Sequence, residues 1–178
     1  KSRLSTEPLQ SVLGVLSVWI DLQRSAIVGN GAIAIAELFI DEGAVIGNHC
    51  LIRDHSYIGK NVVVGAHSEV KNSILYDNVE IHHNFIGDSV LDHHCSLGAG
   101  TITANKRFDR KNVKVNVDGK RVDTGLRGLG VVVGAGVKTG INVSLMPGLR
   151  VKAGTVIRPG KVVDQQNVNK IDYQGDQK

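Results

Sequence analysis

Four large polar residues of this chain stand at positions where glycine is the usual residue. Apolar residues return about every sixth position and glycine often follows them, but Arg53, Lys71, Tyr76 and His82 replace that glycine. Arg53 and Lys71 are 18 residues apart, and positive charges on adjacent rungs about 4.8 Å apart repel by roughly 0.8 kcal/mol in water. A bound phosphate would turn that repulsion into attraction, whereas two side chains splayed into solvent would need no ligand.

His82 is the candidate general base, because a neutral imidazole accepts a proton near neutral pH. It lies between Lys71 and a basic segment of the chain. The pairs His82–His83 and His93–His94 do not predict a metal site, because adjacent residues of a strand point to opposite sides. No carboxylate stands at a recognisable ligand spacing either, so we expect no bound metal.

The apolar repeat that positions these side chains has a strict period of six, which neither a helix (period 3.6) nor a strand (period 2) produces. In a parallel β-helix, each six-residue unit forms one short strand and one corner, and three units close a coil. The sequence therefore predicts an all-β fold, a left-handed parallel β-helix of hexapeptide repeats with an inserted basic loop. One series contains Val28, Ala34, Ile40, Ile46, Ile52, Ile58, Val64 and Val70, and the other Val133, Thr139, Leu145, Val151, Ile157 and Val163.

The repeat also defines the expected organisation of the chain, whose 178 residues suit one domain. Residues 1–25 form a non-repetitive lead-in, a helix or an arm, and residues 26–163 form the β-helix. A polar insertion occupies residues 103–130, and residues 164–178 form a polar tail. Insertions of solenoids emerge from one face, often the binding face, so the insertion is a candidate functional element.

Composition and charge narrow the class of partner. The formal net charge is +4, and between Lys106 and Arg127 eight basic residues face three acidic ones. Such a patch attracts phosphate groups. Phe108 is the one aromatic residue within it, which disfavours nucleic acid as the partner.

Several features indicate a cytoplasmic protein. No signal peptide is visible, and the apolar segment 11–22 is too short to span a membrane. Cys50 and Cys95 lie inside repeats and read as small buried apolar residues in a reducing compartment.

A second irregularity precedes the insertion, because the step between Val70, Leu75, Ile81 and Ile86 shrinks twice from six residues to five. A shorter step tightens a corner and redirects its side chains, and irregularities of β structure often lie beside functional sites. Alternatively, the shortened steps are sequence drift in an old repeat and have no functional meaning.

The segment 97–105, which ends the first block of coils, is rich in small residues. Such residues would let a ligand approach the backbone closely, or they merely form tight turns.

The chain contains, in this order, Arg53, Lys71, His82, the string GAGTITAN (98–105) and Lys111. In this order of residues, the sequence resembles the C-terminal acetyltransferase domain of bifunctional N-acetylglucosamine-1-phosphate uridyltransferases. The strings NKRFDRKNVKV (105–115) and GINVSLMPG (140–148) are most similar to its archaeal branch, the sugar-phosphate nucleotidylyltransferase/amino-sugar acetyltransferases. The resemblance covers residues 26–163. Hexapeptides alone are shared by many acyltransferases, whereas GAGTITAN with an upstream histidine is much more specific.

The resemblance implies a homotrimer with its active site between subunits, acetyl-CoA as co-substrate, and His82 as the general base. Asn105 would orient the base or the sugar. The sugar phosphate would be held by Arg53, Lys71, Lys111 and Lys114. The acetyl-CoA groove would be lined, mostly through backbone groups, by Ala99, Ala135 and Ala153.

Two residues depart from the family pattern. Phe85 stands where the family usually has a substrate-contacting tyrosine, and Ser96 replaces an asparagine common in the bacterial branch. Both leave the identity of the acceptor open. The chain also lacks the glycine-rich nucleotidyltransferase motif, so we expect this piece not to make a nucleotide sugar by itself.

The function expected is acetyl-CoA-dependent N-acetylation of glucosamine 1-phosphate or galactosamine 1-phosphate, in the synthesis of UDP-N-acetylhexosamine. Neither cysteine has a reason to form an acyl-enzyme, which favours direct attack in a ternary complex. Three alternatives stay open: a non-catalytic trimerisation or regulatory β-helix of a nucleotidylyltransferase, an acyltransferase of the same fold with another acceptor, and a β-helical carbonic anhydrase relative with zinc between subunits.

Overall fold

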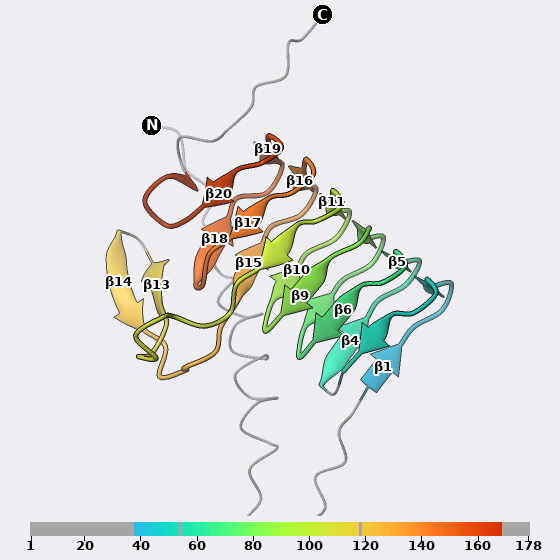
Figure 1. Cartoon of the computed structure of the whole chain (residues 1–178), viewed down its shortest axis with the longest axis horizontal. Helices are drawn as coiled ribbons and strands as arrows, with labels where there is room; N and C mark the ends of the chain where they lie inside the picture. The colour runs from blue at the N-terminus through green and yellow to red at the C-terminus, as the bar shows by residue number, and fades with distance from the viewer. Residues whose placement is uncertain (1–37, 54, 118, 169–178) are drawn as a thin grey trace, which may run out of the picture. The chain divides into compact units, whose positions relative to one another are not determined.

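The computed structural model describes residues 38–53, 55–117 and 119–168, all within the unit 37–178. The segment 1–25, predicted as a lead-in, lies outside the described residues. In the described part, short strands alternate with corners and pair in parallel with the strand one coil away (Figure 1). The expected all-β fold of stacked parallel coils is confirmed.

Three sheets of six strands form the sides of the solenoid. Sheet A contains β1 (Leu38–Ile40), β4 (Ser56–Ile58), β7 (Ile74–Leu75), β10 (Val90–Leu91), β15 (Val131–Val133) and β18 (Leu149–Val151). Sheet B contains β2 (Val45–Ile46), β5 (Val63–Val64), β8 (Glu80–Ile81), β11 (Ser96–Leu97), β16 (Lys138–Thr139) and β19 (Val156–Ile157). Sheet C contains β3 (Leu51–Ile52), β6 (Glu69–Lys71), β9 (Phe85–Gly87), β12 (Ile102–Thr103), β17 (Ser144–Leu145) and β20 (Val162–Val163). The chain passes from A to B to C in every coil, which defines an A–B, a B–C and a C–A corner.

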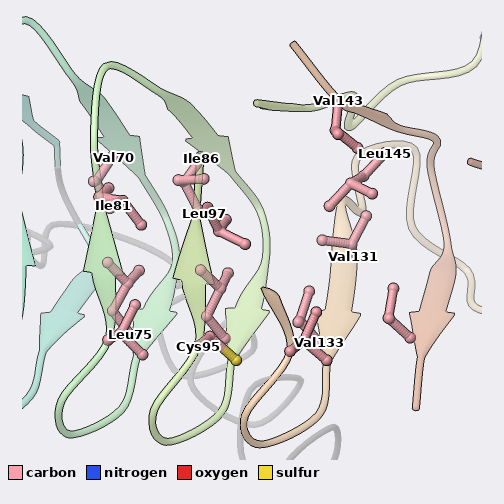
Figure 2. Packing of buried hydrophobic residues seen from close by; sticks show 14 of the residues in the cluster. Val70, Leu75, Ile81, Ile86, Cys95, Leu97, Val131, Val133, Val143 and Leu145 are labelled. Carbon is pink, nitrogen blue, oxygen red and sulfur yellow. The ribbon is translucent and has the colours of Figure 1, made fainter. Parts of the chain in front are cut away.

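The residues of the six-residue repeat fill the interior between the sheets. Ile58, Val64 and Val70, one from each sheet, have no exposed surface. Figure 2 shows the apolar side chains of successive coils stacked in this interior, from which they exclude water. In the first described coil, Ile40 is still 49% exposed. Thr139 is the one polar member of its series, and its Oγ1 lies 2.9 Å from Thr101 Oγ1.

The shortened steps leave the pairing of strands intact. Ile40 pairs with Ile58, 18 residues on, but Ile58 pairs with Leu75, 17 residues on, and Val70 with Ile86, 16 residues on. The missing residues are therefore taken from corners rather than from strands. The coil shortened in this way carries His82 and Phe85.

The basic insertion is docked to the solenoid. After β12 the chain leaves the coils and forms an antiparallel hairpin of β13 (Lys114–Val117) and β14 (Lys120–Asp123) (Figure 1). Val113 and Val115 are buried, and Arg150 Nη1 donates to the Asn116 carbonyl at 3.0 Å. These contacts fix the hairpin against the later coils.

Gly148 and Gln165 complete the docking of the hairpin. Gly148 has φ +74°, and a Cβ built on it would lie 2.6 Å from the Lys114 carbonyl oxygen, so only glycine fits without a shift. Gln165 Nε2 donates to the carbonyls of Lys114, at 2.6 Å, and Gly148, at 3.0 Å. Residues just after the last strand therefore brace the root of the insertion.

Candidate active site

His82 lies on the B–C corner, directly after β8, and its side chain is exposed. Gly65 occupies the same position one coil earlier and Gly98 one coil later, as the pairing of the strands before them shows. The imidazole is thus a large polar group in a column of glycines. Its backbone is held in place because Ser68 Oγ donates to the His82 carbonyl.

Asn84 stabilises the same corner from within. Its side chain is buried, and Nδ2 donates to the carbonyls of Gly98, at 2.9 Å, and Thr101, at 3.0 Å. Its backbone N–H donates to Ser68 Oγ at 3.2 Å. The corner that carries His82 is therefore tied to both neighbouring coils.

Lys71 and Asn105 lie close together on the C–A corner, at the other end of the sheet C strands from His82. Lys71 is the last residue of β6, and its Nζ lies 3.4 Å from Asp88 Oδ2. Asn105 follows β12, and its Nδ2 donates to the same oxygen. Sequence reasoning selected Lys71 and Asn105 but missed Asp88, the carboxylate that connects them.

Arg53 belongs to the same column as Lys71, one coil earlier. Its Nη1 lies 3.0 Å from Glu69 Oε1, and both side chains are partly exposed. The repulsion expected between Arg53 and Lys71 is therefore offset within the protein by Glu69 and Asp88. Charge repulsion alone no longer argues for a bound phosphate, and sequence reasoning missed both acidic partners.

Phe85 lies between the two ends, on the outer side of sheet C. Ile86 is fully buried, so the alternating side chains place Phe85 outward. A Cβ built on Gly87 would lie 2.8 Å from Phe85 Cε1 and 3.3 Å from Asn105 Nδ2. The ring and the amide therefore converge over Gly87. We call the outer positions Glu69, Phe85 and Ile102, which pair in register, the sheet C face.

The two lysines of the insertion that were predicted to hold the sugar phosphate, Lys111 and Lys114, are exposed. Arg107 makes two hydrogen bonds to Asp109, of 2.8 and 2.6 Å, and they hold the pKa of that carboxyl well below its usual range. Asp109 is therefore ionised at neutral pH and forms an ion pair with Arg107.

The three alanines predicted for the acetyl-CoA groove occupy two corners. Ala99 follows β11 on the B–C corner, next in the chain to the glycine stacked over His82. Ala135 and Ala153 stack on the A–B corner, where Gly154 N–H donates to the Ala135 carbonyl at 2.8 Å. Within one chain, sheet B separates the two groups.

Several other aromatic and histidine side chains contact one another along the corners. His49 and His67 stack with ring centroids 5.2 Å apart, and His67 meets His83 edge-on at 6.4 Å. Tyr76 stacks on His93 at 5.0 Å on the A–B corner, away from the sheet C face. Over the described ranges, no three His, Cys, Asp or Glu side chains converge as a metal site would require.

A parallel solenoid built of six-residue units defines a hexapeptide-repeat fold, and solved structures share this fold. PerB from Caulobacter crescentus, solved in complex with CoA and GDP-perosamine, superimposes with a TM-score of 0.51 at 18% identity, covering 67% of this chain and 49% of that chain. A point mutant of this perosamine N-acetyltransferase, solved with the same two ligands, gives the same TM-score at 20% identity.

The chain belongs to the family described as GMPPB C-terminal domain, whose model matches residues 34–125. The bifunctional sugar-1-phosphate nucleotidylyltransferase/acetyltransferase of Sulfurisphaera tokodaii is 48% identical over 98 residues, which are 54% of this chain and 24% of that protein. The bifunctional protein GlmU of Methanocaldococcus jannaschii is 48% identical over 99 residues, 55% of this chain and 24% of that protein. The predicted resemblance to the archaeal branch is confirmed, and the chain spans about a quarter of the length of these relatives.

Within the described ranges, no helix has the length and apolar character needed to cross a bilayer.

Proposed function

We propose that this chain is an acetyl-CoA-dependent N-acetyltransferase whose acceptor is a hexosamine 1-phosphate bound across the sheet C face. The observation that carries the proposal is the placement of an exposed imidazole, His82, at one end of this face and of Lys71 with Asn105 at the other. A hexosamine 1-phosphate has an amine, which needs a base, and a phosphate, which needs cations, and this face carries both kinds of group. The relative named as a nucleotidylyltransferase/acetyltransferase supports the reaction class.

In this proposal the phosphate lies near Arg53 and Lys71, and the sugar ring lies over Phe85. Arg53 has Glu69 and Lys71 has Asp88 as carboxylate partners, so each cation is already ordered before the acceptor binds. Ordered binding groups lose less conformational entropy on binding. Phe85 offers an apolar surface for the sugar ring without the hydroxyl that the family's tyrosine supplies.

The amine attacks the thioester carbon of acetyl-CoA directly. The new C–N bond forms, the C–S bond breaks, and His82 takes the proton from the amine and returns it to the departing CoA sulfur. Holding both substrates together lowers the barrier by up to roughly 7–11 kcal/mol, and a positioned base contributes about 10²–10⁴-fold in rate. Ala99 beside the His82 corner and the Ala135–Ala153 pair line the acetyl-CoA path in this proposal.

The first test measures free CoA thiol released from acetyl-CoA by the purified chain, with glucosamine 1-phosphate, galactosamine 1-phosphate, unphosphorylated glucosamine or no acceptor. We expect release that depends on an amino-sugar phosphate and is much weaker with glucosamine. A folded chain that releases no thiol with either phosphate would contradict the proposed acceptor. Release with a nucleotide-linked amino sugar instead would assign another acceptor, and Phe85→Tyr would then test the missing hydroxyl.

The second test asks whether a neighbouring copy completes the site, as the family resemblance implies, with Lys111 as the residue tested. Inactive His82→Ala and Lys111→Ala chains are unfolded together, mixed in equal amounts and refolded. In a cyclic assembly with shared sites, about a quarter of the sites would carry both wild-type residues and regain activity. Recovery at that level supports a shared site, whereas no recovery would place both residues of each site in one chain.

A further inference from the structure

Asp88 is a buried carboxylate that three donors reach from two parts of the chain. It lies in the turn between β9 and β10, is 4% exposed, and has φ +50°. Asn72 Nδ2 donates to Oδ1 at 2.7 Å, Lys71 Nζ lies 3.4 Å from Oδ2, and Asn105 Nδ2 donates to that same oxygen. A buried carboxylate normally requires such partners, because an unpaired charge is costly away from water.

The same residue also contacts the root of the basic insertion. Gly130 N–H donates to the Asp88 carbonyl at 2.8 Å, and a Cβ built on Gly128 would lie 3.3 Å from Asp88 Oδ2. Leu129 N–H donates to the Asn105 carbonyl at 2.9 Å. Asp88 therefore lies where three segments meet: the end of β6, the end of β12, and residues 128–130, which lead from the insertion back into β15.

Burial distinguishes Asp88 from its partners. The Asp88 side chain is 6% exposed and the Lys71 side chain is 28% exposed, so the lysine is partly open to solvent while the carboxylate is buried. Asn105 is likewise only partly buried. The buried carboxylate thus contacts the lysine ammonium and the asparagine amide from the interior of the protein. The solvent-facing sides of both groups stay open to a ligand.

We propose that Asp88 is a positioning residue of the acceptor site. Its carboxylate fixes the ammonium of Lys71 and the amide of Asn105 at the C–A end of the sheet C face, where both bind the phosphate-bearing end of the acceptor. This inference rests on the proposed function, and it assigns a role to a residue that does not itself touch the substrate.

The test is Asp88→Asn, which keeps the shape of the side chain and removes its charge. We expect the KM for glucosamine 1-phosphate to rise roughly tenfold, as when a group that orients a binding side chain is lost, with the KM for acetyl-CoA unchanged. Asp92→Asn is the matched control, because Asp92 is a corner carboxylate paired with His93 at 2.7 Å, away from the sheet C face. Equal KM values for the acceptor in Asp88→Asn and wild type would overturn the inference.

Measuring Asp88→Asn in a second variant chain distinguishes a positioning role from a purely structural role of Asp88. If Asp88 acts through Lys71 and Asn105, Asp88→Asn has a much smaller effect on the acceptor KM in a Lys71→Ala/Asn105→Ala chain than in wild type. An equal effect in both backgrounds would show that Asp88 acts only as a structural brace. Asn72→Ala covers the case in which Asp88→Asn does not fold, and we expect a smaller rise of the acceptor KM from it, whereas an unchanged KM would count against the inference.

The wild-type chain distinguishes failure of this inference from failure of the proposed function. Acceptor-dependent thiol release by wild type, with no change in Asp88→Asn, removes only the role of Asp88. No thiol release, together with no binding of glucosamine 1-phosphate in calorimetry, removes both.

Discussion

Gly65 and His82 are adjacent in the column of the B–C corner, and their backbones are in close contact. Gly65 N–H donates to the Ile81 carbonyl at 2.7 Å, and a Cβ built on Gly65 would lie 2.7 Å from the His82 Cα. Real Cβ atoms do not approach backbone atoms so closely. The absence of a side chain at Gly65 therefore sets the position of the candidate base.

Gly65→Ala tests this relationship. The added methyl group must displace the His82 backbone, so we expect a loss of about 1–3 kcal/mol in unfolding free energy, as for other overpacked sites, and a lower kcat in the folded protein. Gly59→Ala is the matched control, because its Cβ would meet Asp77 Oδ1 at 2.7 Å on a corner remote from His82. Similar losses of stability, with kcat reduced only in Gly65→Ala, would support the prediction; an unaltered kcat in Gly65→Ala would contradict it.

His82→Ala is expected to reduce turnover by about 10²–10⁴-fold, the usual contribution of a positioned base. The side chain is exposed, so unfolding temperature and the affinity for acetyl-CoA should change little. His83→Ala removes the neighbouring exposed imidazole and should keep most of the activity. A His82→Ala chain that retains most of the wild-type rate would refute the assignment of the base.

Thr139→Val tests why one position of the apolar repeat is polar. Thr139 Oγ1 lies 2.9 Å from Thr101 Oγ1 and accepts from Gly98 N–H at 3.0 Å. Valine removes both contacts, whereas Thr101 Oγ1 can still donate to the Gly140 carbonyl at 3.3 Å and Gly98 N–H to the backbone carbonyl of residue 139 at 3.1 Å. We therefore expect a loss of roughly 0.5–1.5 kcal/mol, the net contribution of a typical hydrogen bond. Denaturant unfolding measures the change. The double variant Thr101→Val/Thr139→Val should recover part of the loss, and no recovery would show that the hydroxyl pair is not its cause.

Cys95 provides a prediction on pH. Burial raises the pKa of its thiol from 9.0 to about 11, because the charged thiolate is disfavoured in the core. The unfolded chain therefore ionises first, and the contribution of Cys95 to stability is present below about pH 9 and is lost as the pH rises toward 11. Cys95→Ala should weaken the loss of stability between pH 9 and 11, measured by denaturant unfolding at each pH. An identical pH profile in both proteins would contradict this linkage.

The burial of Cys95 can also be measured by the reaction of its thiol with a labelling reagent. A thiol reagent at pH 8 should modify Cys95 only after unfolding, because the side chain has no exposed surface and remains protonated. The Cys50→Ser background isolates this signal, and rapid labelling of the native chain would contradict the placement of Cys95 in the core.

The fold could be predicted from the sequence because its information is local. Each apolar residue of the repeat enters the interior by the same six-residue unit, so the period of Ile46, Val64 and Ile157 predicts strands, corners and stacking without knowledge of distant contacts. The two shortened steps and the basic insertion were also visible, because both interrupt that period. His82, Lys71 and Arg53 stood out because large polar residues replace the expected glycine.

The tertiary structure alone decided which of these residues meet. Counting in steps of 18 from Lys71 leads to Ser89, whereas the shortened coil brings Asp88 to it, 17 residues on, and Asn105 a further 17 residues on. Gln165 contacts Lys114 across 51 residues, which no repeat period predicts. Partners of this kind depend on the register between coils, and register is set by the packing of the whole column rather than by any six-residue unit.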